Sequence, residues 1–86
     1  MLDKVKTALR LTTNAFDAEL NDLVAAAVAD LGIAGIFAPD SDPLISRAII
    51  TYCRVHFGSP DDYDRVKASY DEQKAQMQMA EGYGGF

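Results

Sequence analysis

Residues that support metal and thiol chemistry are scarce in this 86-residue sequence, which has one cysteine, Cys53, and one histidine, His56. A single cysteine excludes an internal disulfide, so the composition fits a reducing, cytosolic setting. A structural zinc site takes four ligands, and cysteine and histidine supply only two here. The segment GIAG at residues 32–35 lacks the lysine and the spacing of a phosphate-binding loop. We therefore expect no metal and no cofactor.

Long apolar runs are also missing, and no stretch approaches the length of a transmembrane helix. The segment MLDKVKTALR at residues 1–10 carries charges too early for a secretory signal peptide. A chain of this length forms one domain at most and buries only about 60–65% of its unfolded surface. We expect one helical domain over residues 1–81, whose small core a partner or oligomer would stabilise, and a flexible tail over residues 82–86.

Positive charge is in short supply, because 8 basic residues stand against 13 acidic ones and the net charge is −5. This balance argues against sequence-independent binding to nucleic-acid phosphates, which requires a basic surface. The charge alternates in blocks: +2 over residues 1–13, −6 over 14–42, +2 over 43–59 and −3 over 60–86. Either the blocks balance one another within the chain, or they form subunit surfaces of opposite sign that steer association. The candidate charge pairs between subunits join Lys4, Lys6, Arg10, Arg47 and Arg54 to Asp17, Glu19, Asp22 and Asp30.

Helical periodicity, punctuated by glycine and proline, runs through most of the chain. It predicts helices over residues 2–9 or 2–10, 16–31, 43–57 and 60–80 or 60–81. No segment alternates with a period of two for long enough to predict a sheet. The expected fold is all-α, with about four helices in a small orthogonal or irregular bundle.

Capping residues give the helix ends. Asp42 followed by Pro43 predicts the start of the third helix, because aspartate caps free N–H groups and proline at the first position loses no hydrogen bond. Ser59 followed by Pro60 predicts the start of the fourth helix in the same way. The expected helix stops are Gly32, Gly58 and Gly82.

The third predicted helix is apolar on two faces, which indicates a central position in the bundle. Its first face carries Ile45, Ala48, Ile49, Tyr52 and His56, and the adjoining face carries Ile50, Cys53 and Phe57. The connection before it, residues 32–42, contains Ile33, Ile36 and Phe37. This connection either folds over the core or offers an apolar contact to a partner.

Cys53 and His56 lie three residues apart in TYCRVHFGSPDDYD, just before three aspartates. Side chains three apart on a helix lie alongside each other and rarely form a nucleophile–base pair. Asp61 and Asp62 follow the capping motif, where first-turn acids complement the helix dipole. We therefore interpret this stretch as a buried thiol, a partly buried imidazole and a helix start, and we predict no catalytic residue.

The C-terminal end is rich in apolar side chains. It is either a weakly docked tail or a segment that orders on a partner, since methionines suit adaptable interfaces. The candidate partner-contact residues are Met77, Met79, Tyr83 and Phe86.

Two stretches together resemble the small head–tail connector (head-completion adaptor) proteins of bacteriophages and prophages. These are LDKVKTALRLTTNAFDAELNDLVAAAVADL (residues 2–31) and DPLISRAIITYCRVHFGSPDDYDRVKASYDEQKAQM (residues 42–77). The resemblance rests on packing and capping residues. It implies a non-enzymatic virion protein, made in the bacterial host cytoplasm and placed at the head–tail interface. Its copies, usually twelve, would form a ring on the portal protein, extend the DNA channel and dock the next stopper or tail-completion protein.

Other functions fit the residues less well. A connection of about ten residues between the second and third helices is too long for a helix-turn-helix, and the third helix is too apolar to enter a DNA groove. A small acidic phage regulator or inhibitor that acts by protein–protein binding is the remaining alternative, because many acids lie on the second and fourth helices.

Overall fold

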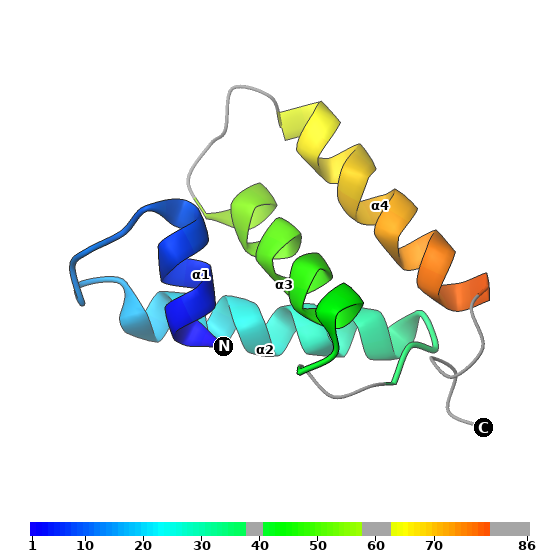
Figure 1. Cartoon of the computed structure of the whole chain (residues 1–86), viewed down its shortest axis with the longest axis horizontal. Coiled ribbons are helices and arrows are strands. Elements are labelled where there is room, and N and C mark those ends of the chain that lie inside the picture. Colours follow the sequence, from blue (N-terminus) through cyan, green and yellow to red (C-terminus); the bar gives the residue numbers. More distant parts are fainter. Residues whose placement is uncertain (38–40, 58–62, 80–86) are drawn as a thin grey trace.

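The computed structural model describes residues 1–37, 41–57 and 63–79. Within these ranges the chain forms four α-helices and no strand. They are α1 (Leu2–Leu9), α2 (Asp17–Ile33), α3 (Pro43–His56) and α4 (Tyr63–Met79) (Figure 1). The predicted all-α fold is confirmed.

Helix α3 is the central element, because it packs against each of the other three helices. Figure 1 shows α3 and α4 side by side, with α3 lying across α2 and α4 running down toward the C-terminal end of α2. Helix α1 lies against α2 and α3. The side chains of Ala48, Ile49 and Cys53 have no exposed surface, and Ile45 is 2% exposed. The predicted central position of this helix is confirmed, and its burial follows from apolar residues on two adjoining faces.

The predicted end of α2 at Gly32 is wrong, because the helix continues to Ile33 and Gly35 adopts the left-handed conformation with φ 82°. The Gly35 N–H donates to the Gly32 carbonyl, and the Ile36 N–H donates to the Leu31 carbonyl, both at 2.9 Å. This turn brings Ile36 back onto the core, where it is 3% exposed. The two added helical residues therefore accompany the burial of Ile36, which local sequence does not reveal.

The connection after α2 was expected either to fold over the core or to offer an apolar contact to a partner, and its described residues do some of each. Ile36 folds onto the core, whereas the side chains of Ile33 and Phe37 remain 88% and 58% exposed. One part of this segment therefore closes the core, and its neighbours leave apolar surface uncovered.

The capping residue of α3 is confirmed. The Asp42 carboxylate accepts hydrogen bonds from the N–H groups of Leu44, at 2.9 Å, and Ile45, at 3.4 Å, and Pro43 occupies the first turn. The predicted signals at Gly58, Ser59–Asp62 and Gly82 lie outside the described residues.

Replacing Asp42 by alanine is expected to lower the free energy of unfolding by about 1 kcal/mol, because two N–H groups at the start of α3 lose their acceptor. Urea unfolding followed by circular dichroism measures the change. Asp42→Asn is the matched control, since asparagine caps about as well as aspartate. An equal loss in both variants would contradict the capping role.

Candidate interaction surfaces

The Cys53 and His56 side chains do not form a reactive pair. Cys53 is fully buried, and this burial raises the pKa of its thiol to about 11, so the nucleophilic thiolate is disfavoured. His56 is exposed, which corrects the expectation of a partly buried imidazole. The centroid of its ring lies 4.3 Å from the centroid of the Tyr52 ring. Residues 1–37, 41–57 and 63–79 contain no group of three His, Cys, Asp or Glu side chains able to hold a metal ion.

Three residues from the predicted charge pairs have partners inside the chain. Lys6 Nζ lies 3.0 Å from Asp17 Oδ1 and donates to Asn14 Oδ1 at 2.7 Å, which ties α1 to the start of α2. Lys74 Nζ lies 3.1 Å from Asp30 Oδ2. The charges of Lys6, Asp17 and Asp30 are therefore neutralised within the chain and not by a neighbouring subunit.

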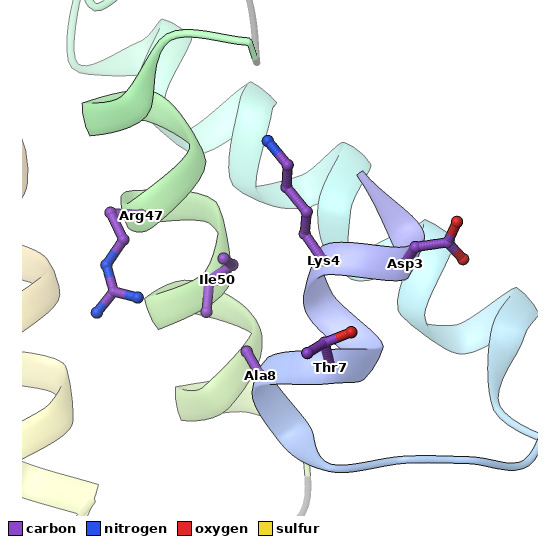
Figure 2. A pocket seen from close by; sticks show the side chains of 6 residues that line it. All are labelled: Asp3, Lys4, Thr7, Ala8, Arg47 and Ile50. Carbon is purple, nitrogen blue, oxygen red and sulfur yellow. The ribbon is translucent and has the colours of Figure 1, made fainter.

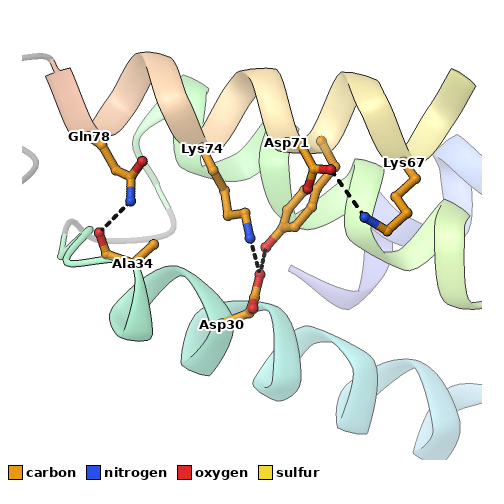
Figure 3. Close-up of polar contacts among 7 residues, drawn as sticks. Asp30, Ala34, Lys67, Asp71, Lys74 and Gln78 are labelled. Carbon is orange, nitrogen blue, oxygen red and sulfur yellow. Dashed lines mark hydrogen bonds and ion pairs between the residues drawn. The ribbon is translucent and has the colours of Figure 1, made fainter.

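Asp30 is the centre of a polar contact between α2 and α4 (Figure 3). The Tyr70 hydroxyl donates to Asp30 Oδ2 at 2.5 Å, beside the Lys74 ammonium. The Tyr70 hydrogen bond and the Lys74 charge lower the pKa of Asp30. Burial and the same hydrogen bond raise the pKa of Tyr70. One turn further, the Gln78 amide donates to the Ala34 carbonyl at 3.0 Å, so this contact fastens the C-terminal half of α4 to α2.

Sequence reasoning placed Asp30 among the charge pairs between subunits. The structure shows that its carboxylate meets the Tyr70 hydroxyl of the same chain, although 40 residues separate them. The available signal was the position of Tyr70, because a buried tyrosine hydroxyl usually finds a hydrogen-bond partner.

The other basic candidates lie on the surface. Lys4, Arg10, Arg47 and Arg54 are exposed, and their side chains form no ion pair with the described residues. Glu19 and Asp22, near the start of α2, are exposed in the same way. These six charges remain available for contacts with another molecule.

Two hollows flank the outward side of α3. The first, of about 410 Å³, lies between α1 and α3 and is lined by Asp3, Lys4, Thr7, Ala8, Arg47 and Ile50. Figure 2 shows Arg47 reaching from α3 toward α4, and Ile50 and Ala8 between α1 and α3. The second, of about 260 Å³, lies between α3 and α4 and contains Arg47, Arg54 and Arg65 together with Thr51, Val66, Ser69 and Gln73. Because Arg47 lines both, the two hollows adjoin along α3 between α1 and α4, and we call them together the valley.

The outward side of α2 carries apolar residues without a partner in the described chain. Leu20, Ala27 and Leu31 face the core, yet Val28 is 50% exposed and Ile33 is 88% exposed. A helix that is apolar on both sides is typical of a buried position. The outer face of α2 is therefore a candidate contact surface.

The C-terminal candidates have different environments. Met77 is 2% exposed and belongs to the core, so the structure removes it from the predicted partner surface. Met79, two residues on, is 87% exposed. Tyr83 and Phe86 lie outside the described residues.

A small helical chain whose described surface offers unpaired charges and apolar side chains fits the class of structural, assembly-forming proteins. A family model for phage connector proteins matches residues 1–84, so the chain belongs to the phage connector protein family. Neither a curated protein nor a solved structure matches the chain. The family is a structural one whose members interact with other head and tail proteins of the virion. No helix in the described part of the chain is long and apolar enough to cross a membrane.

Proposed function

We propose that this chain is the head–tail connector subunit of a phage or prophage. It assembles as a ring, usually of twelve copies, on the portal vertex. There it extends the DNA channel and docks the next stopper or tail-completion protein. The observation that carries the proposal is the family match over residues 1–84.

Two physical features support this proposal. The small domain leaves apolar side chains uncovered on α2, which association with other subunits would bury. The net charge of −5 also suits a DNA conduit, since a basic lining would hold DNA by its phosphates.

Native mass or light scattering of the protein, alone and mixed with the portal protein encoded beside it, tests the function. The expected result is a ring-sized species or comigration with the portal ring. A chain that remains monomeric and does not bind the portal would overturn the proposal and favour a small acidic regulator or inhibitor.

The C-terminal segment, with Met79, Tyr83 and Phe86, is the proposed portal contact. Deleting residues 82–86 is expected to leave the helical signal and the unfolding midpoint unchanged and to weaken portal binding about tenfold or more, because aromatic anchors dominate interfaces. Binding of the deletion variant to immobilised portal measures the effect, with Tyr83→Ala and Phe86→Ala as smaller changes. Unchanged binding by the truncated protein would remove this segment from the interface.

A further inference from the structure

The outward side of α3 forms the floor of a basic valley. Arg47 and Arg54 lie two turns apart on α3, and Arg65 lines the same hollow from α4. Three of the eight basic residues thus gather in one place on a protein of net charge −5. The part of the valley toward α1 is lined by Ile50 and Ala8 together with Asp3, Lys4 and Thr7, so charged and apolar surface adjoin there, and Ile50 itself is 9% exposed.

The outer face of α2 has complementary properties. Residues 18, 22, 25, 29 and 33 follow helical spacing on the side away from Leu20, Ala27 and Leu31, and the half-exposed Val28 lies about 100° around the helix from this row. Ala18, Ala25 and Ala29 are small, so another helix can approach closely, and Ile33 projects at the C-terminal end. Asp22 is the one charged residue in this row, and Glu19 flanks it.

Arg47 and Arg54 are seven residues apart, about 10 Å along the α3 axis, so a helix that lies along α3 passes over both. When Asp22 lies over the arginines, the row from Ala25 to Ile33 can run along the apolar part of the valley. A helix in a groove is a common mode of protein recognition.

The valley suits a protein occupant better than DNA. Its part toward α1 is lined by the apolar side chains of Ile50 and Ala8, which have no counterpart in a phosphate chain.

We propose that the outer face of α2 in one copy of this chain lies in the α1–α3–α4 valley of the next copy, with Asp22 against Arg54. The two surfaces differ, so the contact is head-to-tail, and such contacts close into a ring when the rotation between copies permits. This inference rests on the proposed connector function, because it names the surfaces through which neighbouring subunits would meet.

Charge reversal tests the pairing. Arg54→Glu and Asp22→Arg each place like charges at the contact, so each alone is expected to raise the concentration needed for assembly about tenfold or more. An equal mixture of the two variants is expected to assemble with the variants alternating around the ring. At every second contact the native Asp22 meets the native Arg54, and at the others an arginine at residue 22 meets a glutamate at residue 54. The mixed ring should contain an even number of subunits. Native mass gives the number of subunits in each species, both free and bound to the portal ring.

Controls separate this contact from general charge effects. Lys67→Glu changes the charge by the same amount as Arg54→Glu, but Lys67 lies outside the valley, on the side of α4 that faces Asp30, and should leave assembly unchanged. Circular dichroism should give nearly equal helicity for all variants, since Arg54, Asp22 and Lys67 are exposed and the Lys67–Asp71 ion pair that Lys67→Glu removes lies on the surface.

The pairing would be overturned if both single variants assembled normally, or if the mixture failed to assemble while the wild type formed rings. It would also be overturned if the protein retarded duplex DNA in a gel and Arg54→Glu abolished this binding without changing the ring mass. A wild-type chain that forms no multimer, free or on the portal, would instead overturn the connector function itself.

Discussion

Replacing Ile49 by alanine is expected to lower the free energy of unfolding by about 2–5 kcal/mol, because the removed atoms leave a cavity. Ile49 has no exposed surface and lies on α3, the helix that packs against all the others. The loss is large for a domain of this size, whose total stability is typically about 5–15 kcal/mol. Urea denaturation, followed by far-UV circular dichroism at low protein concentration, measures the shift in midpoint.

Ile33→Ala is the matched control for Ile49→Ala. It removes the same atoms from a side chain that is 88% exposed, so the expected change in the dissociated chain is within about 0.5 kcal/mol. Similar losses at residues 49 and 33 would contradict the central position of α3.

Replacing Tyr70 by phenylalanine is expected to lower the free energy of unfolding by about 1–2 kcal/mol at pH 7. The change removes a hydroxyl that donates to the charged Asp30 carboxylate, and hydrogen bonds to charged groups contribute more than neutral ones. The lower part of the usual range applies because Asp30 is partly exposed and Lys74 remains beside it. Tyr63→Phe is the matched control, since Tyr63 is 43% exposed, and it should have little effect.

The same substitution should change the pH dependence of stability. The pKa of Asp30 is lower in the folded chain than its ordinary value of 3.8, so near that pH the unfolded chain binds more protons than the folded one. The contribution of Asp30 to stability is therefore complete above the unfolded-state pKa and is lost as the pH falls through the folded-state pKa. The difference between wild type and Tyr70→Phe should shrink over this acid range. A difference that stays constant from pH 7 to pH 2 would contradict the contact between Tyr70 and the Asp30 carboxylate.

Local sequence signals predicted the helices well where the capping residues act on their immediate neighbours. Asp42 and Pro43 specify the start of α3, and the apolar spacing from Leu2 specifies α1 to within a residue. The end of α2 was missed because Gly32 is compatible with a helix interior when the next turn gains enough burial. That gain comes from Ile36 reaching the core, which is a property of the packed chain.

The candidate surface was predicted only in part, because charge blocks do not specify pairs. Lys6, Asp17 and Asp30 belong to the predicted set but are neutralised within the chain, whereas Arg47 and Arg54 remain on the surface. The valley over α3 was not predicted at all. It forms only when α1 and α4 pack on either side of that helix, which brings Lys4, Arg47 and Arg65 around adjoining hollows.

The sequence alone determined the helical class, the central third helix, the alternating charge and the scarcity of metal and thiol chemistry. These properties depend on residue type and on spacing within a few turns. The tertiary structure decided which charges are paired, that Met77 is core while Met79 is surface, and that α2 exposes its outer face. These outcomes depend on how the helices cross. Crossing is set by contacts between residues such as Asp30 and Tyr70, 40 positions apart, and no local pattern specifies it.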